Sequence, residues 1–141
     1  AAGLGALFAG IEPWTRYQPG AATLSTLFTP AADNAIRMTP RTPDGEAAGI
    51  LVLRHPWLAG PYVQFLAVAP DHQGLGLGAA MLAWCEAEAR AAGQRNLWIC
   101  AAAFNEGAER LYRRFGFERV AVLEDLLKDG FHETFMRKRL G

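Results

Sequence analysis

The clearest pattern along the chain is the recurrence of apolar residues at helical spacing in two segments, residues 76–92 and 105–115. Positions three and four apart share one face of an α-helix, so each segment predicts a helix with a single buried stripe. The apolar positions are Leu77, Met81, Cys85 and Ala89 in the first segment, and Ala108, Leu111, Tyr112 and Phe115 in the second. Gly93 and Gly116 are typical helix stops, and Asn105 is a typical helix N-cap.

Apolar runs between turn signals predict the strands. Residues 62–68 are almost all apolar or aromatic, which is typical of a central strand covered on both faces. Residues 96–101 predict the next strand, and the helix between the two makes a right-handed parallel crossover. Two hairpins are expected outside this unit, with strands at 34–38 and 48–53 around the turn at 42–45, and with strands at 117–123 and 131–138 around the turn at 128–130.

The whole pattern predicts one α/β domain over residues 1–141, because repeats, low-complexity segments and linkers are absent from the sequence. Weaker helical spacing predicts two short helices at residues 1–10 and 21–28. Glu86 and Arg90, four residues apart, are expected to pair on the surface of the helix over 76–92.

Composition argues against nucleic acid, a membrane and a metal ion as partners. The chain carries 14 acidic and 14 basic residues, so it has no overall field that would favour nucleic acid or an anionic membrane. No apolar run reaches the length of a membrane span and no basic signal region opens the chain, so we expect a cytoplasmic protein. Cys85 and Cys100 lack metal-ligand spacing and the three histidines are scattered, so we expect no metal and reduced core thiols.

Candidate chemistry concentrates in the glycine-rich segment between the central strand and the helix that follows it. Glycines at alternate positions let backbone approach a ligand, and a helix N-terminus presents unsatisfied N–H groups, so this segment is a candidate site for a pyrophosphate. The residues that would form it are Gln73, Gly74, Leu75, Gly76, Leu77, Gly78 and Ala79. A plain glycine-rich turn would leave the same pattern. The G-x-x-G spacing of a dinucleotide fingerprint and the G-K-[ST] of a Walker A loop are both missing.

Two sequence blocks resemble those of the GNAT superfamily of N-acetyltransferases. The first is V-x-P followed by Q-x-x-G-x-G, carried by Val68, Pro70, Gln73, Gly76 and Gly78. The second is N-x-x-A-x-x-L-Y-x-x-x-G-F, carried by Asn105, Ala108, Leu111, Tyr112, Gly116 and Phe117. The resemblance is strong from about residue 62 to residue 117 and loose in the flanks.

The resemblance implies a mixed sheet whose two central parallel strands splay apart, flanked by helices. The family fold opens with a strand that has no counterpart before Ala1, so we expect the first strand to be missing at the N-terminus. Acetyl-CoA would be the co-substrate. Its pantetheine arm would pair with the backbone of Leu66, Ala67 and Val68 and contact Asn105, which would also serve as a cap.

The implied reaction is direct attack of a primary amine, on a small molecule or a peptide, through a tetrahedral intermediate. Tyr112 matches the family's catalytic acid, although a core tyrosine would occupy the same helix position. A non-catalytic acyl-CoA-binding module and a homodimer both remain open. The general base is not assigned; the candidates are Glu12, His55, Asp125, His132 and Glu133. The acceptor pocket would draw on Trp14, Tyr17, Trp57 and Leu126, with Glu12, Arg16, Asp125 and Asp129 among them.

Overall fold

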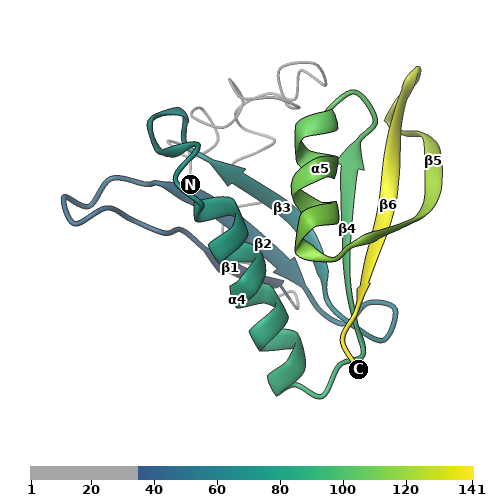
Figure 1. The fold of residues 1–141 in the computed structure, drawn as a ribbon, viewed down its shortest axis with the longest axis horizontal. Helices are drawn as coiled ribbons and strands as arrows, with labels where there is room; N and C mark the ends of the chain where they lie inside the picture. The colour runs from purple at the N-terminus through teal and green to yellow at the C-terminus, as the bar shows by residue number, and fades with distance from the viewer. Residues whose placement is uncertain (1–34) are drawn as a thin grey trace.

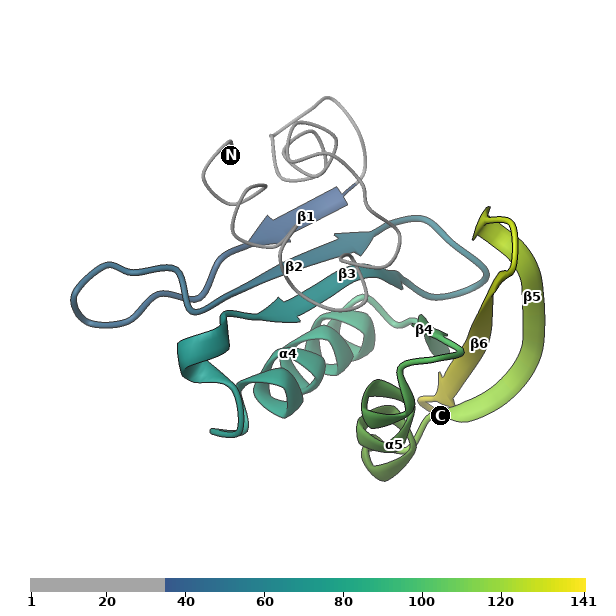
Figure 2. The ribbon, with the colours of Figure 1, turned by 90° about the horizontal axis from the view of Figure 1, so that it is seen from above.

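The structure, a computed structural model, describes residues 35–141. These residues form a six-stranded mixed sheet with two α-helices, α4 and α5, on one face (Figures 1 and 2). The strands are β1 (Ala35–Met38), β2 (Gly49–Arg54), β3 (Tyr62–Val68), β4 (Asn96–Ala102), β5 (Glu118–Lys128) and β6 (Phe131–Arg139). The helical segments are the short 3₁₀ turn η1 (Pro70–His72), α4 (Leu77–Ala91) and α5 (Glu106–Phe115). The helices expected at 1–10 and 21–28, and the loop between them, lie outside the described residues.

The sheet has the order β1-β2-β3-β4-β6-β5, and every neighbouring pair is antiparallel except β3 and β4. The parallel pair is in register only at Tyr62 with Trp98 and at Val63 with Ile99. Beyond these residues the two strands diverge, as Figure 1 shows. β3 also carries one extra residue, Gln64, in its pairing with β2. The splayed parallel pair implied by the resemblance is therefore confirmed.

Both predicted helices are present, with ends within a residue or two of the expected positions. Met81, Leu82, Cys85 and Ala89 of α4 are buried in the core with Leu97 and Ile99 of β4. Burial raises the pKa of the Cys85 thiol to about 12, which keeps this side chain an unreactive apolar core residue. Gly116 ends α5 with φ of 113°, a left-handed conformation that favours glycine.

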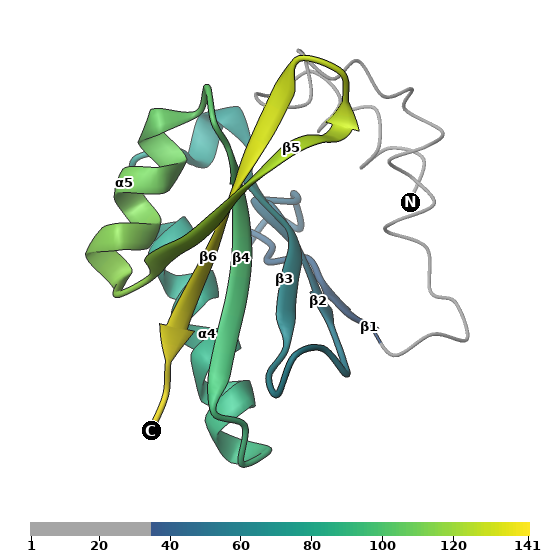
Figure 3. The same ribbon diagram turned by 90° about the vertical axis from the view of Figure 1, so that its right-hand side faces the viewer.

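The closing hairpin differs from its prediction because β5 continues to Lys128. The pairing of β5 with β6 is interrupted, since Leu123 faces Glu133 whereas Lys128 faces Phe131. The residues between bulge out of the ladder, and Asp125 within the bulge has a positive φ of 52°. The hairpin is strongly twisted along its length (Figure 3). Its bulge displays Leu126 and Leu127, which are 48% and 59% exposed.

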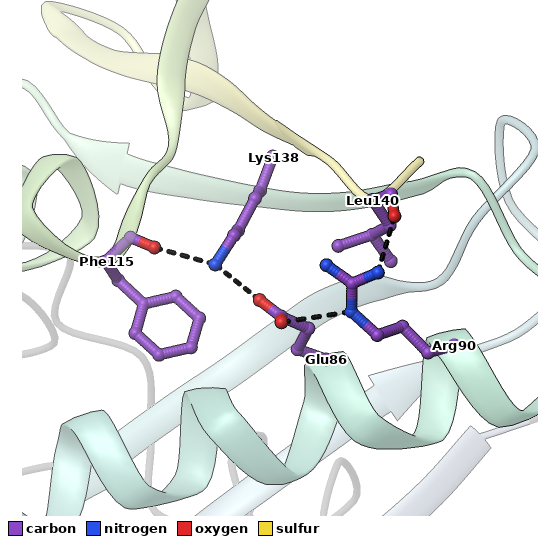
Figure 4. A network of polar contacts seen from close by, with 5 residues as sticks. All are labelled: Glu86, Arg90, Phe115, Lys138 and Leu140. Atoms are coloured by element: carbon purple, nitrogen blue, oxygen red, sulfur yellow. Dashed lines mark hydrogen bonds and ion pairs between the residues drawn. The ribbon is translucent and has the colours of Figure 1, made fainter.

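A polar network fastens α4 to the last strand and to the end of α5 (Figure 4). The Lys138 ammonium on β6 binds the Glu86 carboxylate on α4 and donates to the Phe115 carbonyl, 2.9 Å away. Arg90 donates to Glu86 at 3.1 Å, as the sequence predicted, and also to the Leu140 carbonyl at 2.5 Å. The predicted pair of Glu86 and Arg90 is therefore part of a larger network that connects α4 with β6 and α5.

Among residues 35–141, no helix combines the length and apolar character that a bilayer crossing requires. Nor, in that part of the chain, do three histidine, cysteine, aspartate or glutamate side chains gather where they could hold a metal ion.

Candidate active site

The segment after β3 forms a loop whose backbone is exposed at its glycines. Gly74 and Gly76 have φ of 79° and 81°, and a Cβ built on either would have no atom within 4 Å. The Gln73 side-chain amide donates to the Val68 carbonyl at 3.1 Å, so it closes the loop onto the end of β3. Positive φ and open space together leave a cradle that side chains at these positions would fill.

The loop leads directly into the N-terminus of α4. The first backbone bond of this helix runs from the Ala80 N–H to the Gly76 carbonyl, at 3.0 Å. The N–H groups of Leu77, Gly78 and Ala79 therefore have no acceptor within the helix, and all three residues line the same cavity. Amide donors at the positive end of a helix dipole suit a phosphate or pyrophosphate, so the loop fits the diphosphate of coenzyme A.

The gap between β3 and β4 offers backbone hydrogen-bonding groups to the same space. The Ala69 N–H donates to Ala48, on the side of β2. N–H groups alternate in direction along a strand, so those of Leu66 and Val68 point toward the gap and that of Ala67 points toward β2. Leu66 thus presents its backbone N–H and C=O to the opening, and Val68 presents its N–H, while the Val68 carbonyl already accepts from Gln73.

One cavity of about 1020 Å³ joins the loop, the gap and α5. Of the residues expected to bind acetyl-CoA, ten line this cavity: Leu66, Ala67, Val68, Gln73, Gly74, Gly76, Leu77, Gly78, Ala79 and Asn105. Leu75 is absent from the lining and is 76% exposed. Its side chain points to solvent, so only its backbone could take part.

Asn105 and Tyr112 both reach the cavity from α5. The Asn105 side-chain oxygen accepts from the Ala108 N–H at 3.1 Å, which confirms the predicted N-cap. Tyr112 is 7% exposed and packs edge-on against Phe117, with ring centroids 6.1 Å apart. Burial raises the pKa of its hydroxyl above the ordinary tyrosine range, with smaller contributions from Glu133 and Cys100. At neutral pH Tyr112 is therefore a protonated hydroxyl inside the cavity.

Three further polar side chains meet at the point where β3 and β4 part. Tyr62 and Cys100 form a side-chain hydrogen bond, and Glu133, which is 7% exposed, lies close enough to both to raise the pKa of each. The dominant cause of both raised pKa values is burial. Cys100, expected to be an ordinary core thiol, instead lines the cavity. Only strand register brings these residues together, although a charged Glu133 between Phe131 and Phe135 was a visible signal.

The expected acceptor residues divide into three groups. Trp57 and Leu126 line the cavity, and the Trp57 ring stacks on Tyr62 with centroids 5.2 Å apart. Of the base candidates among the described residues, Glu133 lines the cavity, whereas His55, Asp125 and His132 do not. Asp129, expected in the acceptor pocket, does not line it either. Glu12, Trp14, Arg16 and Tyr17 lie outside the described residues.

Comparison with known proteins places this cavity in a family context. A model of the acetyltransferase (GNAT) family matches residues 10–117, more than half of the chain. Streptothricin acetyltransferase from Streptomyces lavendulae is 29% identical over 98 residues, which cover 66% of this chain and 52% of that protein. The chain therefore spans about half the length of this curated relative.

Solved structures of acetyltransferases share the fold of this chain. The crystal structure of nourseothricin acetyltransferase has a TM-score of 0.72 and 27% identity, covering 80% of this chain and 69% of that one. A GNAT family acetyltransferase from Elizabethkingia anophelis, solved with acetyl-CoA bound, has a TM-score of 0.73, covering 94% of each chain; its 19% identity supports the fold alone. With the family match over most of its length and the splayed sheet around a glycine-rich loop, the chain belongs to the GNAT family of acetyltransferases.

Proposed function

We propose that this protein is an N-acetyltransferase that moves the acetyl group of acetyl-CoA to a primary amine on a small molecule or a peptide. The observation that carries the proposal is the continuity of the cavity. A single space runs from the amide-lined loop, through the gap between β3 and β4, to Tyr112 and Glu133. An acyl donor with a diphosphate at one end and a thioester at the other fits this arrangement.

The donor end of the site is built from backbone. The N–H groups at the start of α4 would hold the diphosphate, and the pantetheine arm would lie in the gap beside Leu66 and Val68. A strand N–H in the gap would also polarise the thioester carbonyl. Such a fixed donor lowers the barrier by a few kcal/mol, since it is already oriented toward the oxygen on which charge develops.

Tyr112 would protonate the departing sulfur. Collapse of the tetrahedral intermediate breaks the C–S bond and leaves coenzyme A as a thiolate, which needs a proton donor nearby. The Tyr112 hydroxyl lies in the cavity, and its raised pKa keeps it protonated at neutral pH. The position of this group at the gap, rather than its acidity, would supply the rate enhancement.

The acceptor side favours an amine. Trp57 and Tyr62 stack to form an aromatic wall, and Glu133 adds a carboxylate within the same cavity. An aromatic face and a carboxylate both attract a cation, as an alkylamine is at neutral pH. The carboxylate also counts against the alternative of a non-catalytic acyl-CoA-binding module, because it supplies an acidic residue to the acceptor side of the cavity.

The test is thiol release from acetyl-CoA with a panel of acceptors: simple alkylamines, peptides with free N-termini, and streptothricin, the substrate in the name of the relative. We expect amine-dependent release with at least one acceptor, and a product heavier by one acetyl group. Tight binding of acetyl-CoA without transfer to any acceptor would instead support the binding module. Absence of acetyl-CoA binding would overturn the proposal.

A further inference from the structure

Glu133 holds an unusual place for a charged side chain. It lies in the middle of β6, in register with Ala102 of β4 on one side and Leu123 of β5 on the other. It is 7% exposed, and among residues 35–141 it is the only aspartate, glutamate, lysine or arginine that is buried. Carboxylates are seldom buried without a specific role, because leaving water disfavours the charged form.

Strand alternation places Glu133 on the face of the sheet opposite the helices. Leu97, Ile99 and Ala101 of β4 face the core beneath α4 and α5, so Cys100 and Ala102 face the other way. Residues paired across an antiparallel ladder share a face, so Glu133 lies on the side of Ala102.

Tyr112 approaches from the other side. It belongs to α5 and to the core cluster beneath the helices, yet it lines the same cavity as Glu133. The two groups also interact, because Glu133 contributes to the raised pKa of Tyr112. A phenol and a carboxylate therefore meet at the opening between β3 and β4 from opposite faces of the sheet.

We propose that Glu133 accepts the proton that the acceptor amine must lose before it attacks the thioester. The inference rests on the proposed function and adds a residue to it. A thioester lying in the gap would have Tyr112 on the side of α5 and Glu133 on the opposite face of the sheet, where the stacked Trp57 and Tyr62 form the wall. The reaction needs a proton acceptor near the incoming nitrogen and a proton donor near the departing sulfur, and these two side chains could supply them from the two faces of the sheet.

The proton transfers balance. Glu133 takes one proton from the ammonium, the neutral nitrogen forms a bond to the thioester carbon, and the C–S bond breaks. The sulfur takes the proton of Tyr112. The second proton of the nitrogen then returns to the Tyr112 oxygen through solvent, and the proton on Glu133 leaves to solvent. The net products are the acetamide, coenzyme A and one proton.

The groups that face Glu133 set its environment. Tyr62 from β3, Cys100 from β4 and Tyr112 from α5 are titratable, and all three are held protonated by raised pKa values. Leu123 from β5 is apolar. Titration of these three neighbours therefore does not account for a change in rate between pH 7 and pH 8.

The experiment compares Glu133→Gln with the parent protein on two acceptors. One is an alkylamine, charged at pH 7 with a pKa of about 10. The other is an arylamine, already neutral at that pH. The glutamine keeps the size of the side chain but cannot take a proton. Glu118→Gln, an exposed change of the same charge on β5, is the matched control.

We expect kcat/KM of Glu133→Gln for the alkylamine to fall by about 10²- to 10³-fold, within the range for a positioned proton acceptor. The fall for the arylamine should be tenfold or less, by the same reasoning, because that amine has no proton to lose before attack. The ratio of the two rates, measured on one sample, does not depend on how much of the variant is folded. The rate of Glu133→Gln with the alkylamine should also rise about tenfold per pH unit between pH 7 and pH 8, because without the carboxylate only amine that is already neutral in solution can react.

Equal losses on both acceptors, or no loss on either, would overturn the assignment of Glu133. If Glu118→Gln also changed the ratio of the two rates, the assignment of Glu133 would be overturned as well. The change would then come from the loss of one negative charge and not from the position of Glu133. These outcomes differ from failure of the proposed function, in which the parent protein itself transfers no acetyl group to either acceptor.

Discussion

At the scale of single residues, the hydroxyl of Tyr112 carries the chemical part of the proposal. Tyr112→Phe removes this oxygen and keeps the ring, so packing against Phe117 and acetyl-CoA affinity should change little. We expect kcat to fall by about 10²-fold, because the thiolate that needs the proton forms late in the reaction. The measurement is steady-state kinetics with the best acceptor found, so that amine attack does not mask the loss.

Tyr62→Phe is the matched control, since it also removes a cavity hydroxyl, in this case the one bonded to Cys100. It should keep most of the parent's kcat, because its ring, and not its oxygen, faces the acceptor in the proposal. If both variants lose the same activity, the effect belongs to any lost hydroxyl in this cavity, and Tyr112 is a core tyrosine.

Gly76 tests the phosphate loop. Its φ of 81° is left-handed, and a side chain there would enter the space where a diphosphate would lie. We expect Gly76→Val to remain folded, since no atom lies within 4 Å of an added Cβ, but to lose measurable acetyl-CoA binding by calorimetry. Gly45→Val is the control: its φ is 88° and its surroundings are equally open, but it lies in the turn between β1 and β2.

The two glycine variants should share a similar loss of stability, about 1–2 kcal/mol from the left-handed backbone. Only Gly76→Val should lose the ligand. If it binds acetyl-CoA as tightly as Gly45→Val does, the loop does not hold the diphosphate.

At the scale of elements, the second half of the loop before β3 is bound to β4 and to the residue before it. The Ala59 carbonyl accepts from the Arg95 N–H at 3.3 Å and from the Asn96 side chain at 3.1 Å. The Leu58 carbonyl accepts from the Trp98 indole at 2.8 Å. This seam holds Trp57 beside Tyr62 and so shapes the acceptor side of the cavity.

Gly60 is the tightest point of the seam. A Cβ there would lie 1.9 Å from the Asn96 carbonyl oxygen, and backbone cannot move aside as a side chain can. We expect Gly60→Ala to lower the free energy of unfolding by about 2–4 kcal/mol, as overpacking does. In α5, Gly107→Ala meets nothing closer than 3.8 Å and should be neutral or stabilising, by up to about 1 kcal/mol. Urea denaturation of both variants measures the difference; equal effects would contradict this account.

The elements also show where sequence reasoning works. The extents of α4 and α5 were predictable because an apolar stripe fixes the body of a helix and glycines fix its end. The divergence of β3 and β4 came from the family resemblance, since both strands read as ordinary apolar runs. The length of β5 was underestimated because its bulge breaks the alternation that marks a strand.

Only part of the cavity could be predicted from the sequence. The glycine loop, Asn105 and Tyr112 lie within short motifs, so their spacing identifies them. Glu133, Cys100 and Tyr62 lie on three strands far apart in the chain, and only the register between strands brings them together. A single sequence does not encode register in any local pattern, so Glu133 stood among five candidate bases.

At the scale of the whole molecule, opening the sheet for a ligand weakens the joint between its halves. β3 and β4 pair at only two positions, so the antiparallel strands β1 to β3 are linked to β4, β6 and β5 by a short ladder. α4 strengthens the link between the two halves of the sheet, because it packs against both β3 and β4. The polar network of Glu86, Arg90 and Lys138 adds a bond from α4 to β6 and α5 (Figure 4).

This network should make stability depend on pH. The hydrogen bond from Lys138 is the main cause that lowers the pKa of Glu86, with Arg90 adding to it. A carboxylate whose pKa is lower in the folded state stabilises the protein above its unfolded pKa of about 4.3, and that contribution is lost as the pH falls through the folded pKa.

Glu86→Gln should therefore lower the free energy of unfolding by about 1 kcal/mol at pH 7, and its difference from the parent should narrow as the pH falls below 4. Glu106→Gln removes a carboxylate that is 81% exposed and 3.9 Å from Arg110, so its effect should stay within about 0.5 kcal/mol at every pH. Urea denaturation of the three proteins at pH 7 and at stepwise lower pH measures both curves, and a Glu86→Gln difference that persists unchanged at low pH would show that the ion pair is not its source.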